Sequence, residues 1–398
     1  MSEMEGGDSM KGIERRERMN LTGGKKEKWP MVRLGDVCDI LDSQRVPVTE
    51  SKRVKGPYPY YGANGIQDYI NDYIFDGELV LLAEDGGYFG DKTRPIAYRV
   101  SGKCWVNNHA HVLRPKQDSH LDIDYLNYSL MYYDVSKLIN GTTRSKLNQA
   151  AVRRMTIPLP PLPEQQRIAA VLDHISSLIA LRKAQIEKLD MLVKARFVEM
   201  FGDPVKNEMG WDLRTIGSFA NVVTGATPNR NNSKYYENGV VPWIKTGEIE
   251  AGYIYNSEEY ISEMALTDTN CKLLPVNTIM VAMYGQGKTR GQVGILKIEA
   301  ATNQACGAIL PNNKYCPEYL YYHLKLEYNQ LRGLGRGCQQ TNLNLSIVKN
   351  FPIMDVPLDI QQRFIPVIER IENEKCICIQ ALEKLEIMKK SLMQEFFG

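Results

Sequence analysis

The sequence predicts an α+β protein with two mixed α/β domains in a pseudo-twofold arrangement, separated by two long antiparallel helices that form a coiled coil. Three observations predict this fold. The second half of the chain repeats the first half, each copy ends in a long helical pattern, and each copy begins with short apolar runs broken by glycine and proline.

The repeat is gapless over about 55 residues at the end of each copy. Leu147-Asn148 recurs as Leu343-Asn344 and Phe201-Gly202 recurs as Phe397-Gly398, an offset of 196 residues in both cases. The copies also begin alike, since an aromatic residue precedes an aliphatic-glycine pair in both. A chain with two copies of one unit has pseudo-twofold symmetry, which suits a target with two half-sites.

The end of each copy has apolar residues at spacings of three and four, which trace one stripe over roughly nine helical turns. Such a helix would span roughly 55 Å. The second copy has Pro366 where the first has Ala170, so its helix either begins near Pro366 or kinks there. Two matching stripes favour an antiparallel pair, and packing of each helix on a separate core is the alternative.

The expected domain order follows from these patterns. We expect a disordered tail at 1–24, a first domain at 25–157, a first spacer helix at 158–203, a second domain at 204–353 and a second spacer helix at 354–398.

The composition is that of an ordinary globular protein, with 43% hydrophobic and 24% charged residues. No run of eighteen apolar residues occurs, so we expect no membrane span. A net charge of +2 means that any DNA contact must come from local clusters of lysine and arginine. The eight cysteines form no C-x-x-C pair and none lies at zinc-finger spacing from His109 and His111, so we predict no metal site.

Several motifs carry a resemblance to a known family. They are Leu159-Pro-Pro-Leu-Pro-Glu-Gln-Gln-Arg-Ile168 before the first long helix, Phe201-Gly-Asp-Pro204 after it, Pro357-Leu-Asp-Ile-Gln-Gln-Arg363 in the second copy, and the segments Tyr60 to Gly65, Gly141 to Asn148 and Gln340 to Asn344. With these motifs the chain resembles, from Trp29 to Gly398, the specificity subunit of a Type I restriction–modification system.

In that family, two target-recognition domains each bind one half of a split DNA sequence. Two helical regions hold the domains apart and bind two modification (methyltransferase) subunits, and restriction (motor-nuclease) subunits join for cleavage. The resemblance therefore implies double-stranded DNA and both kinds of subunit as partners, in the cytoplasm of a bacterium or archaeon. S-adenosylmethionine, ATP and magnesium would belong to the partner subunits, and this chain would hold no cofactor.

Each copy has a glycine-rich basic loop after an apolar run, at 84–94 and at 284–292. Glycine lets a backbone approach a duplex closely, and Lys-Thr-Arg offers donors to phosphate and guanine. The alternative is a hairpin with an ordinary solvated tip. The residues that we expect to contact DNA are Tyr88, Lys92, Thr93 and Arg94 in the first loop, and Gln286, Lys288, Thr289 and Arg290 in the second.

A second basic loop precedes each long helix and suits contact with the DNA backbone, with simple linkage to the helix as the alternative. Its candidates are Arg144 and Lys146 in the first copy, and Arg336, Gln339 and Gln340 in the second. Aromatic residues between prolines and glycines could stack at a base step, although local core is the commoner role of such residues. These candidates are Tyr60, Tyr61 and Trp243, with Lys245 beside the tryptophan.

The chain lacks recognisable catalytic motifs. Gly285 to Thr289 suggests a nucleotide-binding loop, but Ala282 stands where that motif needs glycine. The Asn-Pro-Pro-aromatic and Asp-Pro-Pro-aromatic tetrapeptides of amino-methyltransferases are absent as well. These absences predict a chain without a catalytic site of its own. The resemblance implies that it is a non-catalytic subunit of a Type I restriction and DNA adenine methyltransferase complex.

A pair of helices covers only one face of each helix, so apolar residues such as Leu181 and Leu192 remain for the binding of partner methyltransferases. The predicted function is sequence-specific reading of a bipartite duplex, one half-site per domain, which directs the partner subunits to it. The alternative is a protein-interaction scaffold with two adaptor domains on a coiled coil and no role in DNA binding.

Overall fold

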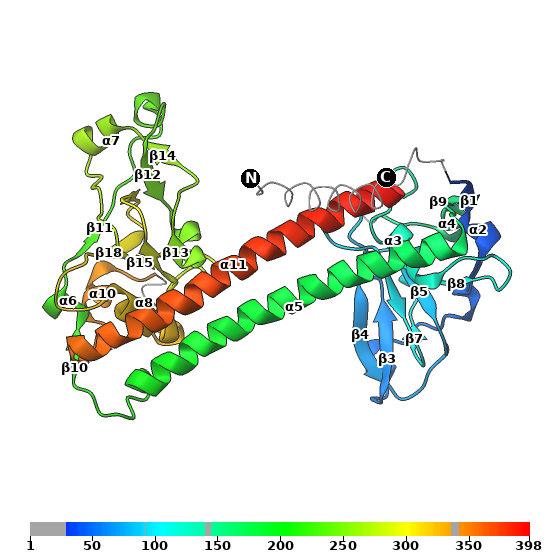
Figure 1. Ribbon diagram of the computed structural model, residues 1–398, viewed down its shortest axis with the longest axis horizontal. Helices are drawn as coiled ribbons and strands as arrows, with labels where there is room; N and C mark the ends of the chain where they lie inside the picture. Colours follow the sequence, from blue (N-terminus) through cyan, green and yellow to red (C-terminus); the bar gives the residue numbers. More distant parts are fainter. Residues whose placement is uncertain (1–28, 92, 140–144, 336–341) are drawn as a thin grey trace, which may run out of the picture. The chain divides into compact units, whose positions relative to one another are not determined.

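The computed structural model describes residues 29–91, 93–139, 145–335 and 342–398, so the tail predicted at 1–24 lies outside the described residues. The chain divides into two compact units (Figure 1). Unit 1 contains the residues up to Ala180 together with Glu383–Gly398, and unit 2 contains Leu181–Leu382. Each unit therefore includes a part of both long helices.

Unit 1 is built on an antiparallel sheet of order β2-β8-β5-β6, beside a sheet of order β4-β3-β7 and the pair β1-β9. All five residues of β5 are apolar and buried, which explains its central position. The strands are β1 (Met31–Arg33), β2 (Cys38–Ile40), β3 (Tyr58–Gly62), β4 (Gly65–Ile70), β5 (Leu79–Ala83), β6 (Ala97–Val100), β7 (Trp105–Val106), β8 (Ala110–Pro115) and β9 (Thr156–Pro158). The helices are α2 (Leu34–Val37), α3 (Ile123–Met131) and α4 (Gln149–Arg154).

Unit 2 repeats this topology strand for strand and adds β13 at one edge: its sheets have the orders β11-β18-β15-β16-β13, β14-β12-β17 and β10-β19. The strands are β10 (Leu213–Thr215), β11 (Val222–Thr224), β12 (Val241–Ile244), β13 (Tyr253–Ile254), β14 (Tyr260–Ile261), β15 (Ile279–Ala282), β16 (Val293–Leu296), β17 (Ala301–Thr302), β18 (Cys306–Ile309) and β19 (Pro352–Met354). The helices are α6 (Ile216–Phe219), α7 (Glu263–Asp268), α8 (Pro317–Leu326), α9 (Tyr328–Gly333) and α10 (Leu345–Asn350). The two units therefore share one scaffold, as the internal repeat predicts, and they differ in their insertions.

The two long helices are α5 (Leu162–Phe201) and α11 (Leu358–Phe397), each of 40 residues. Helix α11 contains Pro366, so the alternative in which it begins at this proline is wrong. Pro366 has no N–H to donate to the carbonyl of Gln362, one turn earlier in the helix. Both residues are exposed, so water can donate the missing hydrogen bond to this carbonyl. None of the described helices combines the length and apolar character that crossing a membrane requires.

The start of one long helix meets the end of the other inside each unit. In unit 1, Ile168 of α5 and Phe397 of α11 belong to one hydrophobic core. In unit 2, the ring of Phe201 near the end of α5 lies 5.3 Å from the ring of Phe364 near the start of α11. Because a start meets an end in both units, the two helices run antiparallel, as predicted.

The repeated Gln-Gln-Arg motif ties each long helix to its unit. Gln165 is fully buried; its Oε1 accepts the N–H of Asp122 at 2.9 Å and its Nε2 donates to the carbonyl of Pro160 at 2.8 Å. Gln361 repeats the arrangement, since its Oε1 accepts the N–H of Cys316 at 2.8 Å. Asp122 and Cys316 are the N-caps of α3 and α8. In each unit, one glutamine at the start of a long helix therefore also fixes the beginning of a second, shorter helix.

We expect Gln165→Ala to destabilise unit 1 by about 2–3 kcal/mol, because it leaves buried backbone groups without a hydrogen-bond partner. Chemical denaturation, with hydrogen exchange of the amides of unit 1 as the probe, measures this change in the free energy of unfolding. Gln166→Ala is the matched control, because Gln166 is exposed and its loss should stay within about 0.5 kcal/mol. Equal stabilities of the two variants would contradict the role assigned to Gln165.

Candidate nucleic-acid interface

The glycine-rich loop of unit 1 begins with a buried ion network. Glu84, directly after β5, is only 8% exposed. Arg45 Nη1 donates to its Oε2 at 2.7 Å, and Lys146 Nζ lies 2.9 Å from its Oε1. Lys146, which was predicted to contact DNA, is therefore anchored to the loop while about half of its side chain remains exposed.

The tip of this loop is ordered by Asp91. Its carboxylate accepts the N–H of Thr93 at 2.9 Å, the Thr93 hydroxyl at 2.5 Å and Nε of Arg94 at 2.6 Å. The hydrogen bonds from Thr93, together with the one from Arg94, lower the pKa of Asp91 to about 2. The Arg94 guanidinium lies 3.7 Å from the centroid of the Tyr88 ring. Three predicted residues, Tyr88, Thr93 and Arg94, thus meet at one tip, while Lys92 lies outside the described residues.

The corresponding loop of unit 2 is held by α9. Arg332 Nη1 donates to the carbonyl of Arg290 at 2.8 Å and its Nη2 donates to the carbonyl of Gly287, which has a φ of +56° that favours glycine. The Tyr328 hydroxyl donates to the carbonyl of Lys288 at 2.7 Å. These contacts occupy backbone atoms, so the Lys288 side chain stays exposed, as does that of Gln286. Thr289 and Arg290 are half-buried.

The segment before each long helix is hydrogen-bonded to the loop at the same place in both units. The N–H of Leu147 donates to the carbonyl of Glu84 at 2.8 Å, and the N–H of Leu343 donates to the carbonyl of Met283 at 3.0 Å. The buried Leu147 and Leu343 thus join the described part of each segment to the loop. The other predicted members of these segments lie outside the described residues: Arg144, Arg336, Gln339 and Gln340.

His111 completes the ion network of unit 1. Its Nδ1 lies 2.6 Å from Asp42 and its Nε2 lies 2.7 Å from the carbonyl of Leu147. Burial raises the pKa of Asp42, but the interaction with His111, the hydrogen bond from the Val112 N–H and the charge of Arg45 outweigh it, so the net pKa is lowered.

The ligand atoms of Asp42, Glu84 and His111 lie within 4.8 Å of one another, a spacing that suits a cation. Arg45 and Lys146 already neutralise these carboxylates, however, so the cluster is an ion network that anchors the loop.

Two of the predicted aromatic contacts are corrected by their burial. Tyr60 and Trp243 are each 1% exposed. The Tyr60 hydroxyl donates to the carbonyl of Val48 at 3.2 Å, and Trp243 Nε1 donates to the carbonyl of Ala226 at 3.1 Å. A buried ring cannot stack on a base, so both residues are core and the sequence-based expectation for them is wrong.

The remaining two candidates of this group are half-buried at the surface. Tyr61 packs against Tyr98, with ring centroids 5.9 Å apart. Lys245 Nζ lies 3.3 Å from Glu258 and 3.7 Å from Glu259, so acidic neighbours offset its charge.

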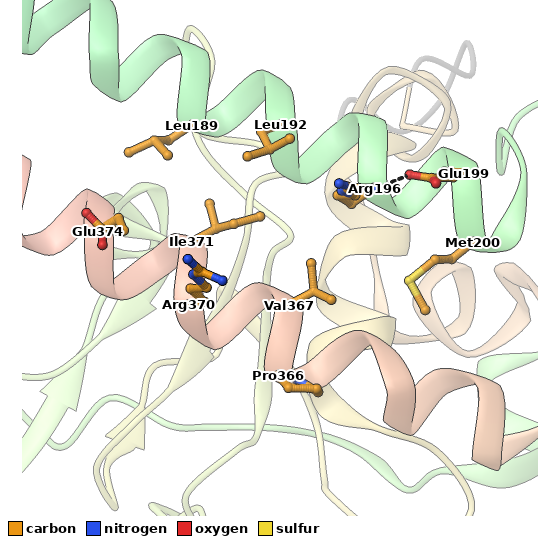
Figure 2. Close-up of a pocket in the computed structure, with 10 residues that line it drawn as sticks. All are labelled: Leu189, Leu192, Arg196, Glu199, Met200, Pro366, Val367, Arg370, Ile371 and Glu374. Carbon is orange, nitrogen blue, oxygen red and sulfur yellow. Dashed lines mark hydrogen bonds and ion pairs between the residues drawn. The ribbon is translucent and has the colours of Figure 1, made fainter.

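An apolar groove between α5 and α11 in unit 2 has a volume of about 710 Å³ (Figure 2). In Figure 2, Leu189 and Leu192 of α5 point towards Val367 and Ile371 of α11. Leu192 is 40% exposed and Leu181, three helical turns earlier, is 65% exposed. Both residues that were predicted to bind a partner are therefore accessible on α5.

Sequence reasoning missed the residues that anchor the loops. Arg45 reaches Glu84 across 39 residues of sequence, and Arg332 reaches Gly287 across 45. Contacts between such distant positions leave no local pattern. The turn at Asn107–His109 could have been found from the sequence, because it aligns with Asn303–Ala305 in the other copy.

Comparison with protein-family models shows the family of this chain. The model of the Type I restriction modification DNA specificity domain, Methylase_S, matches residues 26–191 and again 208–387. The chain belongs to this family. It is thus a specificity subunit, a non-catalytic member of a Type I system, and its class of function is the recognition of a DNA target.

Relatives of known class agree with this assignment. A putative Type I restriction enzyme specificity subunit of Haemophilus influenzae is 39% identical over 158 residues, which is 40% of each chain. A Type I restriction enzyme specificity subunit of Methanocaldococcus jannaschii is 26% identical over 390 residues, with 87% of this chain and 88% of the relative covered.

Among solved structures, the Type I restriction–modification S subunit from M. genitalium has a TM-score of 0.66 at 14% identity. The match covers 94% of this chain and 98% of that chain. It shows that the two proteins share a fold.

Proposed function

We propose that this specificity subunit reads a two-part duplex site, one half-site with each unit, and directs modification and restriction subunits to it. The observation that carries the proposal is the duplication of one surface: a glycine-rich basic loop follows β5 in unit 1 and β15 in unit 2, at the same place in the same topology.

Different residues occupy corresponding places on the two surfaces. The buried ion network of Glu84 and His111 in unit 1 is replaced in unit 2 by Met283 and Gly307, an apolar pair. The loop of unit 1 is ordered by its own Asp91, whereas the loop of unit 2 is held by Arg332. Two surfaces with one scaffold and unlike residues suit two half-sites of different sequence.

The partner subunits would supply the chemistry. The two copies of the helical scaffold suit two modification subunits, and S-adenosylmethionine, ATP and magnesium would be bound by the partners. A subunit that reads chromosomal DNA would act in the cytoplasm of a bacterial or archaeal cell. The specificity subunit itself would supply recognition.

Charge reversal tests the DNA contacts. We expect Arg94→Glu and Lys288→Glu, each in the assembled complex, to lower the affinity for duplex DNA. The slope of log K against log salt concentration should shrink by about one for each lost phosphate contact. Titrations of labelled duplex at several salt concentrations measure both quantities.

The matched controls for charge reversal are Arg114→Glu and Lys314→Glu. Both residues are exposed, and they lie at or beyond the far ends of β8 and β18, away from the loops. These variants should bind like the wild type. If the loop variants bound DNA with unchanged affinity and salt slope, the scaffold without a DNA role would be the better account.

The groove between α5 and α11 is the proposed contact for a modification subunit, because apolar residues of both helices line it and Leu192 is exposed there. We expect Leu192→Glu to weaken binding of the modification subunit at least tenfold, since a charge would be placed in an apolar contact. Titration calorimetry measures the affinity. Lys194→Glu, also exposed on α5 but on another face, is the control, and equal affinity of the two variants would contradict this contact.

A further inference from the structure

A turn in unit 1 presents an amide side chain at the end of the main sheet. Asn107, between β7 and β8, is buried, and its Oδ1 accepts the N–H of His109 at 2.8 Å. Its Nδ2 donates to Gln67 at 3.0 Å. Asn108, which lies between Asn107 and His109, has an exposed side chain. A buried asparagine therefore fixes the turn, and the next asparagine faces outward.

Unit 2 builds the same turn between β17 and β18. Asn303 Oδ1 accepts the N–H of Ala305 at 3.0 Å, and the exposed residue between them is Gln304. The Thr227 hydroxyl donates to Gln304 Oε1 at 2.6 Å, which orients the amide group. The two units diverge at His109 and Ala305, yet both keep a carboxamide at the exposed position.

Both turns are joined to the glycine-rich loops. The N–H of Glu84 donates to the carbonyl of His109 at 2.8 Å, and the N–H of Met283 donates to the carbonyl of Ala305 at 2.9 Å. The exposed amide and the basic loop therefore lie at the same end of the sheet in each unit. A hydrogen-bonding side chain thus lies at the same end of the sheet as the loop that carries the cations.

In unit 1 the turn borders a cavity of about 390 Å³. Asn108 lines it together with Gln67, His109 and Arg53. The Arg53 guanidinium lies 4.3 Å from the centroid of the buried Tyr60 ring, which gives Tyr60 a supporting role there. Apolar residues such as Pro47 and Val48 also line this cavity, while its amides and guanidinium offer the donors and acceptors that a base edge requires.

We propose that Asn108 and Gln304 are equivalent base-reading residues, each of which recognises an adenine in its half-site through the N6 and N7 atoms in the major groove. A carboxamide presents one acceptor and one donor side by side, and these match the N6 donor and N7 acceptor of adenine. The inference rests on the proposed function and adds to it the base that each unit recognises. Neither exposed amide is needed to hold its turn, because Asn107 and Asn303 do so.

The test uses Asn108→Ala and Gln304→Ala in the assembled complex. The preferred site of the wild-type complex is first mapped by sequencing methylated DNA from cells that express it. Duplexes with single-base changes at every position of both half-sites then give the discrimination of each complex. We expect Asn108→Ala to lose roughly 5- to 150-fold discrimination at one adenine of one half-site, and Gln304→Ala to do so in the other half-site.

A duplex with 7-deazaadenine at the same position sharpens the test, because it lacks the N7 acceptor. The wild type should bind it more weakly, whereas the matching alanine variant should not distinguish it from adenine. The matched controls are Gln117→Ala and Asn313→Ala, exposed amides beyond the opposite ends of β8 and β18. These should discriminate like the wild type, and circular dichroism checks that all variants fold.

Wild-type discrimination by both alanine variants would overturn the inference, while the two-part preference of the wild type would still support the proposed function. A loss spread evenly over all sequences, with a smaller salt slope, would mean phosphate contact and would also overturn it. A wild-type complex without any base preference would contradict the proposed function itself.

Discussion

The structure depends on the packing of the end of each long helix against the start of the other inside each unit. In unit 2 the ring of Phe201 lies 5.3 Å from Phe364 and 4.9 Å from Tyr319. In unit 1 the ring of Phe397 lies 5.3 Å from Tyr125. Unit 2 is one contiguous stretch, Leu181–Leu382, whereas the core of unit 1 is completed by the end of α11. The folding of unit 1 therefore depends on residues about 200 positions away.

The chain presents corresponding surfaces twice because the whole unit is repeated. The two sheets, their loops and their short helices recur, and so do the helix ends that complete each core. Gln165 and Gln361 show how closely the copies agree, since both are buried and both receive the N–H of a helix N-cap. The copies diverge in their insertions, in their surfaces and in the contacts beneath these surfaces, where Glu84 corresponds to Met283. A repeated scaffold with unlike surfaces is what the recognition of two different half-sites requires.

Much of the fold could be predicted from sequence, because helical spacing and an internal repeat are local patterns. The helices, their antiparallel direction and the shared scaffold followed from them. The burial and the contacts of individual side chains could not be predicted from these patterns. Tyr60 and Trp243 lie among prolines and glycines, a setting that fits both a core and an exposed contact, and only their burial decides between the two. Glu84 was expected on an exposed loop, but Arg45 and Lys146, both distant in sequence, hold it in the interior.

Hydrogen exchange after removal of residues 383–398 tests whether unit 1 needs the end of α11 to complete its core. The account predicts that protection in β5 and β8 of unit 1 falls roughly 100-fold or more, because aromatic residues are lost from its core, while β15 and β18 of unit 2 keep their protection. Unchanged protection in β5 and β8 would show that unit 1 is complete without the end of α11. That result would contradict the account.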